Sequence, residues 1–144
     1  MKSMTQTRIS SSLEAIIAQT LFRLKREAIV TSYRDRLAIE LLSNRATFAF
    51  QLLEILVGEC GINVILRRVE RAIAANPIAE SDSPERHIEA LCGRIADTVA
   101  TPCISTVHIL QYIVSDPTTA ISAELRNYGI LPEDIGVALQ RLTA

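Results

Sequence analysis

The chain has 144 residues, of which 49% are hydrophobic and only 4% are aromatic. This length suits one compact domain or two small packed halves, and the aliphatic composition favours a helical core. The formal net charge of −1 lacks the basic footprint that nucleic-acid binding requires.

The expected compartment is the cytoplasm. An odd number of cysteines (Cys60, Cys92 and Cys103) argues against a secreted disulfide framework. Residues 1–12 are polar and contain no apolar signal-peptide core. The most apolar stretch, residues 46–58, is shorter than the roughly 20 residues of a membrane span, so we expect no membrane association.

Helical periodicity begins near the N-terminus, where apolar positions recur every three or four residues: Leu13, Ile16, Ile17, Thr20, Leu21 and Leu24. Ser11 or Ser12 is the expected cap of this first helix. Further helices are predicted at about 33–42, 47–57 and 63–75. The third should end in the region of Gly58 and Gly61, because glycine readily adopts the left-handed conformation that ends helices.

A linker rich in turn-forming residues follows at 77–84, and four more helices are predicted beyond it. These cover about 84–99, 105–114, 118–127 and a final segment that starts at Pro132. The apolar stripe of the first of them is formed by Ile88, Leu91, Cys92, Ile95 and Val99. We therefore predict an all-α protein with eight helices.

The two halves of the sequence resemble each other. Leu37, Leu41 and Leu42 match Ile109, Ile113 and Val114 at an offset of 72 residues (109 − 37). Matching Gly61 to Gly129 gives an offset of 68 (129 − 61), which predicts about four extra residues near 45–52. A duplicated helical unit predicts one domain over residues 1–144, built from two pseudo-twofold-related four-helix repeats. The repeats cover about 11–76 and about 84–142, with 77–84 as the linker.

The second half carries a recognisable succession of motifs. Thr106-Val107-His108-Ile109-Leu110 is followed by Leu125-Arg126-Asn127-Tyr128-Gly129-Ile130 and a final helix at 133–142. Residues 33–42 and 57–62 stand for the same motifs in the first half. This succession resembles the N-terminal Clp repeat domain of Clp-type AAA+ unfoldases. The resemblance implies a non-catalytic module that docks substrate or adaptor proteins for ATP-dependent unfolding and proteolysis, with Clp ATPase or protease subunits as further partners.

The resemblance also suggests candidate protein-binding residues at the starts of the two signature helices. The Glu-His pair of the family, whose Glu helps some members bind phosphorylated arginine, is Asp35-Arg36 in the first half and Val107-His108 in the second. The candidates are Tyr33, Asp35, Thr106 and His108, together with Phe48 and Phe50. The two phenylalanines cannot face the same way on a helix, so either one is exposed to a partner or both fill the junction between the halves.

The 144 residues contain no Gly-x-x-x-x-Gly-Lys-Ser/Thr loop, so they cannot bind and hydrolyse ATP by that route. Two alternatives stay open: a domain of a larger unfoldase, or a free-standing Clp-repeat protein that regulates a Clp complex. A helical DNA-binding regulator using 105–114 and 118–127 is less favoured because the sequence lacks basic charge.

Catalytic, cofactor and metal sites are not expected. His87, Cys92, Cys103 and His108 are the one metal-like set, but a five-residue spacing on a helix turns each pair about 140° apart. A small hydrolase using Cys103 and His108 is the weakest alternative, since no third group is available to orient the pair. Glu133 and Asp134 lie in a helix first turn, where the helix dipole accounts for them.

Overall fold

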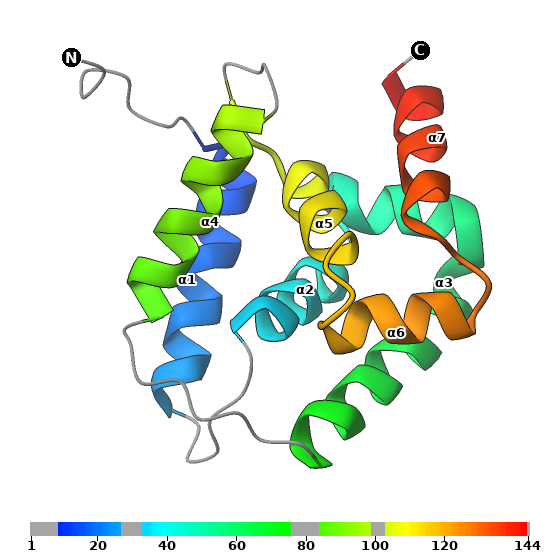
Figure 1. Cartoon of the computed structure of the whole chain (residues 1–144), viewed down its shortest axis with the longest axis horizontal. Helices are drawn as coiled ribbons and strands as arrows, with labels where there is room; N and C mark the ends of the chain where they lie inside the picture. The colour runs from blue at the N-terminus through cyan, green and yellow to red at the C-terminus, as the bar shows by residue number, and fades with distance from the viewer. Residues whose placement is uncertain (1–8, 27–32, 76–83, 99–102, 144) are drawn as a thin grey trace.

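The computed structural model describes residues 9–26, 33–75, 84–98 and 103–143, which form seven helices (Figure 1). Their bounds are α1 Ser11–Arg26, α2 Tyr33–Ser43, α3 Phe48–Ala75, α4 Pro84–Thr98, α5 Thr106–Val114, α6 Ala120–Asn127 and α7 Pro132–Thr143. The described ranges hold no strand, and only an isolated parallel bridge joins Ile9 to Ile104. The predicted all-helical class is confirmed.

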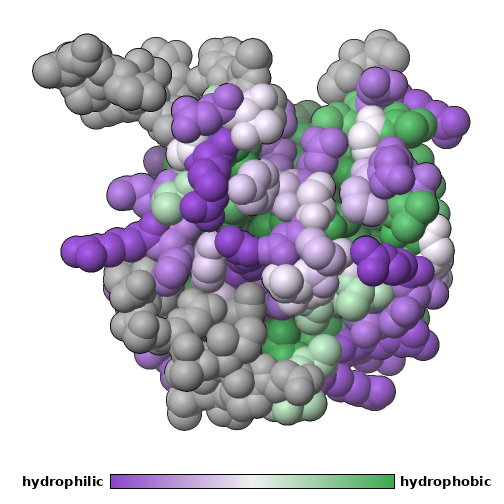
Figure 2. All heavy atoms as spheres, viewed as in Figure 1, coloured by the Kyte–Doolittle hydropathy of each residue, from purple (hydrophilic) through white to green (hydrophobic). Residues whose placement is uncertain are grey.

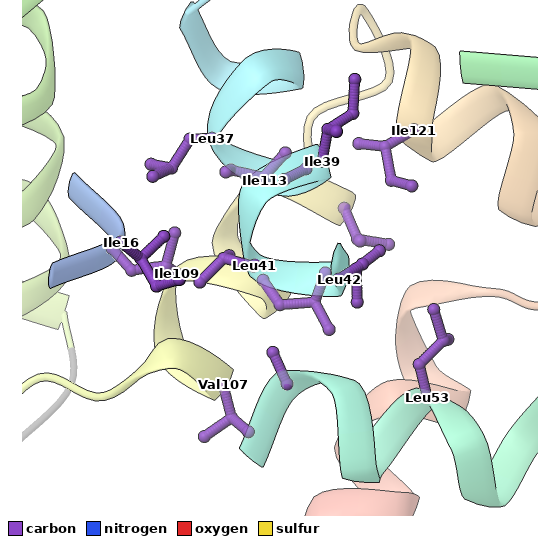
Figure 3. Close-up of a cluster of buried hydrophobic side chains, with 14 of the residues drawn as sticks. Ile16, Leu37, Ile39, Leu41, Leu42, Leu53, Val107, Ile109, Ile113 and Ile121 are labelled. Carbon is purple, nitrogen blue, oxygen red and sulfur yellow. The ribbon is translucent and has the colours of Figure 1, made fainter. Parts of the chain in front are cut away.

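Two short helices, α2 and α5, lie at the centre of the molecule. Nine of the eleven residues of α2 and six of the nine residues of α5 are buried. The two helices pack on each other, and α2 also contacts α1, α3, α4 and α6. Their apolar side chains meet in one cluster (Figure 3) that draws on both halves of the sequence, and Leu37, Leu41, Ile109 and Ile113 are all fully buried in it. The helix α5 is mainly apolar, as expected of a buried helix. The helix α2 buries the polar side chains of Asp35, Arg36 and Glu40 together with its apolar ones.

The remaining helices form two groups around this pair. In Figure 1, α1 and α4 lie side by side on one flank, and both contact α2. On the other flank α3 packs against α6 and α7. We call α1–α3 the first half and α4–α7 the second half. Each half therefore contributes helices to both flanks of one core.

The stripe predicted for α1 is confirmed, although its cap is different. Leu13, Ile16 and Thr20 are buried, and the other stripe residues are packed against the core. The capping residue is Ser10 rather than Ser11 or Ser12, because its Oγ accepts the Leu13 backbone N–H at 3.2 Å. A side chain at the N-cap satisfies one of the N–H groups that a helix start leaves without a partner.

The structure shows seven helices because the predicted third and fourth helices join in α3. Gly58 has φ 74° and ψ 168° inside α3 and kinks it, but helical residues follow at once. This backbone conformation is accessible almost only to glycine. The predicted end of the third helix coincides with this kink at Gly58, which has the expected positive φ, but the next helical segment follows without a loop.

The helix α3 is the one described helix that is long and apolar enough to cross a membrane by length and composition. The apolar stretch is longer than 46–58 because it continues past the kink at Gly58. Core helices of soluble proteins have the same length and composition. In this structure Leu52, Leu53 and Ile62 are fully buried in the shared core.

Some predicted boundaries fall outside the described residues. These are most of the linker 77–84 and the predicted stripe residue Val99. The other four residues of that stripe, Ile88, Leu91, Cys92 and Ile95, are buried as predicted.

Candidate functional site

Two turns with the same hydrogen bonds follow α2 and α5. In the first turn, Thr47 Oγ1 lies 3.0 Å from the carbonyl oxygen of Leu41 and accepts the Phe50 N–H at 3.1 Å. In the second turn, Thr119 Oγ1 lies 3.3 Å from the carbonyl oxygen of Ile113 and accepts the Ser122 N–H at 3.3 Å. Each threonine thus closes the end of one helix and caps the start of the next.

The side chains that open these turns also match. Asn44 Oδ1 accepts the Ala46 N–H at 3.0 Å, and Asp116 Oδ1 accepts the Thr118 N–H at 3.0 Å. In each turn the side-chain oxygen accepts the backbone N–H of the second residue after it, which makes the turn an Asx-turn. The offset of 72 residues (116 − 44) is therefore unbroken through both turns.

The predicted insertion of four residues near 45–52 is not present. The two turns have equal length, and the glycines with positive φ are Gly58 and Gly129. Their separation of 71 (129 − 58) leaves one extra residue in the first half. Gly61, which the sequence pattern pairs with Gly129, instead lies under Tyr128: a Cβ at Gly61 would be 3.0 Å from the Tyr128 hydroxyl oxygen. Gly61 therefore allows the close approach of Tyr128 and does not form a turn.

Each half caps a helix of the other half. Asp35, at the start of α2, accepts the N–H groups of Ala120 at 3.0 Å and Ile121 at 2.9 Å, at the start of α6. Thr106, at the start of α5, accepts the N–H of Ala49 at 3.1 Å, at the start of α3. We call these contacts the reciprocal caps. They join residues 57 to 86 positions apart in the sequence and tie α2 to α6 and α5 to α3.

Burial sets the electrostatics of the reciprocal caps. Asp35 is only 3% exposed. Burial raises the pKa of Asp35, the two backbone N–H groups oppose the rise, and the charge of Asp116 adds to it, so the pKa lies above its ordinary value. The Asp35 carboxylate is therefore turned inward onto the start of α6 and is not presented to solvent.

Most of the other predicted site residues are buried as well. Tyr33 is 6% exposed, and its ring stacks on His87 with a centroid distance of 5.1 Å. Thr106 is buried under the start of α3. Phe50 is buried, whereas Phe48 is 60% exposed. Of the two alternatives for the phenylalanines, the structure shows one exposed ring, and Phe48 is the residue that a partner can reach.

His108 is half-buried in the first turn of α5. Its Nδ1 accepts the backbone N–H of Ser105 at 3.0 Å and lies 3.2 Å from the Ser105 hydroxyl. This is the histidine form of a capping box, in which the third helical residue reaches back to the N-cap. Burial lowers the pKa of His108, which favours the neutral ring that this contact needs.

A hollow of about 560 Å³ lies beside His108 and opens to solvent. Its walls run from the start of α2 to the end of α4 and along α5. Its lining residues are Arg34, Ile95, Thr98, His108, Gln111, Tyr112, Ser115 and Asp116. We call it the α4–α5 hollow. Volumes of 300–1,000 Å³ are usual for ligand sites.

The sequence points to only one of the eight lining residues, His108; Arg34, Tyr112 and Asp116 are among the seven that it does not mark as site residues. Arg34 forms an ion pair with Asp116 across 82 positions, and Arg94 Nε donates to the Tyr112 hydroxyl at 3.2 Å. The sequence signal that could have found them was weak. Arg34 adjoins the candidate Asp35, and Asp116 lies two residues beyond the predicted helix 105–114.

The cysteine and histidine set does not converge on a metal ion. Within the described ranges, no three His, Cys, Asp or Glu side chains are placed to hold one. His87 stacks on Tyr33, Cys92 is buried in the core, and His108 Nδ1 contacts Ser105. Cys103 Sγ lies 3.9 Å from the carbonyl oxygen of Ile104.

The fold and site define an all-helical protein with matched turns and reciprocal caps. Comparison with the models of known families, with curated proteins and with solved structures finds no match to this sequence.

Proposed function

We propose that this protein is a non-catalytic protein-binding module of the Clp N-terminal repeat type, which docks substrate or adaptor proteins for ATP-dependent unfolding and proteolysis in the cytoplasm. The observation that carries the proposal is the pair of matched turns with their reciprocal caps. In this proposal α3 counts as two helices separated at Gly58. Each half then has four helices, and a pseudo-twofold axis relates the halves.

The polar side chains at the helix starts favour a structural role over a catalytic one. At the starts of α2 and α5, where the resemblance places functional residues, Asp35, Thr106 and His108 all accept backbone N–H groups. A catalytic group needs its reactive atom free to meet a substrate. These atoms are instead used to hold helices together.

Exposed apolar side chains supply the contact that an unfolded polypeptide seeks. Among the described residues, the large exposed ones are Phe22, Phe48, Ile55, Val64, Tyr128, Leu131 and Val137. Phe48 and Ile55 are seven positions apart on α3, so they lie on one side of that helix. Figure 2 shows apolar surface interleaved with polar residues on the face in view.

The geometry of α6 disfavours the DNA-binding alternative. A recognition helix presents its N-terminal residues to the base edges in the major groove. The N-terminus of α6 is instead capped by the buried carboxylate of Asp35. The helix carries one basic residue, Arg126, in its last turn.

The test measures binding to a permanently unfolded polypeptide, reduced and carboxymethylated lactalbumin, by fluorescence anisotropy. We expect saturable binding with a Kd of roughly 1–100 μM, since such modules use a few apolar contacts. Native lactalbumin is the control and should not bind. Absence of binding to the unfolded form, or salt-dependent retention on heparin, would contradict the proposal.

A matched pair of variants locates the contact. Phe48→Ser removes a 60% exposed ring on α3, and Phe22→Ser removes a 58% exposed ring on α1. If the α3 surface docks the polypeptide, Phe48→Ser weakens binding about tenfold and Phe22→Ser leaves it unchanged. Both variants should unfold like the parent, because exposed positions contribute little to stability.

The same binding role belongs to the alternative of a free-standing Clp-repeat protein that regulates a Clp complex. The reading frame beyond Ala144 distinguishes the two. An AAA+ module encoded directly after this residue identifies a domain of an unfoldase. A stop codon identifies a separate protein, for which purified Clp ATPase and protease subunits are the partners to test.

A further inference from the structure

The α4–α5 hollow has features that a smooth scaffold surface lacks. It is open to solvent, its floor includes Ile95, and polar side chains of α5 and α2 line its walls. An open hollow suits one end or one side chain of a long ligand better than an enclosed small molecule. The orientation of its polar groups decides which chemistry it accepts.

Two of these groups are hydrogen-bond donors. Because His108 Nδ1 accepts the Ser105 N–H, the neutral ring carries its proton on Nε2, which is therefore a donor. The Tyr112 hydroxyl accepts from Arg94 Nε at 3.2 Å, so its own proton is available to donate. Arg94 also adds a positive charge next to the hollow.

The ion pair between Arg34 and Asp116 leaves hydrogen-bond donors on Arg34 that these contacts do not use. The carboxylate of Asp116 accepts from Arg34, from the Thr118 N–H at 3.0 Å and from the Thr118 hydroxyl at 2.7 Å. Arg34 uses Nε on the Tyr33 hydroxyl and Nη1 on Asp116. A guanidinium has five N–H donors, so three remain after these two contacts.

The resulting charge favours an anion with a single charge. Arg34 and Arg94 are positive, Asp116 is negative and His108 is neutral, which gives a local charge of +1. A planar carboxylate fits the planar, two-pronged donor face of arginine. The Ile95 floor accommodates an apolar group attached to that carboxylate.

The corresponding positions in the first half do not repeat this arrangement. Residues 72 positions before His108, Tyr112 and Asp116 are Arg36, Glu40 and Asn44. Arg36 and Glu40 are buried, and Arg23 pairs with Glu40 at 3.0 Å. An ionised carboxylate at position 40 accepts hydrogen bonds and cannot donate one, so the donors His108 and Tyr112 have no equivalent set in the first half.

We propose that the α4–α5 hollow binds a carboxylate of a polypeptide partner, with Arg34, His108 and Tyr112 as the donors. The proposal rests on the proposed function, because it names the group by which a docked polypeptide is held. The carboxylate comes from the C-terminus of the partner or from an acidic side chain, and the experiment separates these two sources.

The experiment titrates three acetylated pentapeptides into the ¹⁵N-labelled protein and follows amide chemical shifts. The first is Ala-Ala-Ala-Ala-Leu with a free C-terminus, the second is its C-terminal amide, and the third is the amide of Ala-Ala-Glu-Ala-Leu. We expect saturable shifts at Gln111, Tyr112 and Ser115 with at least one of the two carboxylate peptides. The second peptide, which carries no carboxylate, should bind at least about tenfold more weakly. Preference for the first peptide identifies a C-terminal carboxylate, and preference for the third identifies an acidic side chain.

Variants keep the test independent of folding. Tyr112→Phe removes one donor and retains the ring, and Arg34→Met removes the guanidinium. Each should weaken carboxylate binding about three- to tenfold. Arg45→Met is the matched control, because Arg45 pairs with Glu59 outside the hollow and should leave affinity unchanged. Amide spectra of each variant establish that it is folded.

Three outcomes overturn the proposal: equal binding of acid and amide, shifts that map away from the hollow, or inorganic phosphate displacing the peptide better than acetate does. Loss of peptide binding in Arg34→Met with unfolded lactalbumin still bound leaves the proposed function intact. Failure to bind unfolded lactalbumin by a protein that still binds the peptide acid overturns the proposed function and leaves the carboxylate site.

Discussion

At the scale of single residues, two of the candidate binding residues, Asp35 and Thr106, are buried groups that cap helices of the other half. Asp35 accepts two backbone N–H groups, whereas Thr106 accepts one. Hydrogen bonds to an ionised acceptor contribute about 1.5–3 kcal/mol and neutral ones about 0.5–1.5 kcal/mol. The cap on α6 is therefore the stronger of the two, although the raised pKa of Asp35 shows that burial of the charge offsets part of it.

His108 gives a pH-dependent stability that can be measured. Its folded pKa lies below the unfolded value of 6.5 because burial disfavours the charged ring. The stabilising contribution is therefore fully present above about pH 6.5 and is lost as pH falls through the lowered folded pKa. His108→Gln should remove this dependence and keep the cap, because glutamine is a usual third residue of a capping box.

Urea unfolding at pH 7.5 and pH 5 measures the effect. The parent should lose more stability between these pH values than His108→Gln does, with a slope of at most about 1.4 kcal/mol per pH unit. Subtracting the curve of His108→Gln from that of the parent cancels the pH-dependent contributions that the two proteins share. Parallel stability curves for the two proteins would show that protonation of His108 does not disturb the start of α5.

At the scale of elements, the backbone of Gly58 shapes α3. Its φ of 74° with ψ of 168° is unfavourable for a residue with a side chain, although a Cβ there would meet no atom within 4 Å. Gly58→Ala should therefore lower the free energy of unfolding by about 1–3 kcal/mol through backbone strain alone.

Gly93→Ala is the matched control for this substitution. A Cβ at Gly93 would also meet no atom within 4 Å, but this glycine lies within the regular helix α4. Alanine there should raise stability by about 0.5–1 kcal/mol. Chemical denaturation gives both values, and two effects of the same sign would disprove the assignment of the α3 kink to the Gly58 backbone.

The elements also show how far the sequence could predict this fold. Apolar periodicity located α1, α2 and α5 because their buried stripes are local patterns. It missed the continuity of α3, since Gly58 permits both an end and a kink. Matching Gly61 to Gly129 misplaced the register because both dipeptides read Gly-Ile, whereas the backbone angle belongs to Gly58.

The candidate site was less predictable than the fold. The reciprocal caps join Asp35 to Ile121 and Thr106 to Ala49, and no local pattern reports a contact across 86 or 57 positions. The α4–α5 hollow likewise depends on the ion pair of Arg34 with Asp116. Only the choice of the two helix starts as important regions could be made from the sequence.

At the scale of the whole molecule, the matched turns predict matched energetics. Thr47→Val and Thr119→Val each remove a hydroxyl that contacts a helix end and caps the next helix, with almost no change of shape. Each should lower stability by about 1–3 kcal/mol, and the two values should agree within about 1 kcal/mol.

The same variants test whether the halves unfold together. Because α2 and α5 share one core, hydrogen exchange should show both helices opening with the same free energy in the parent and losing protection equally in either variant. Loss of protection confined to the half that carries the substitution would show two independent folding units.

The reciprocal caps have a consequence for fragments of this protein. A polypeptide that ends at Ala75 contains α3 without Thr106, and one that begins at Pro84 contains α6 without Asp35. Each fragment therefore lacks the hydrogen-bond acceptor that caps one of its helices and that only the other fragment provides. When the two fragments are mixed in equal amounts, they should assemble into the folded protein. Fragments that fold only together can serve as a split reporter of the proximity of two proteins fused to them.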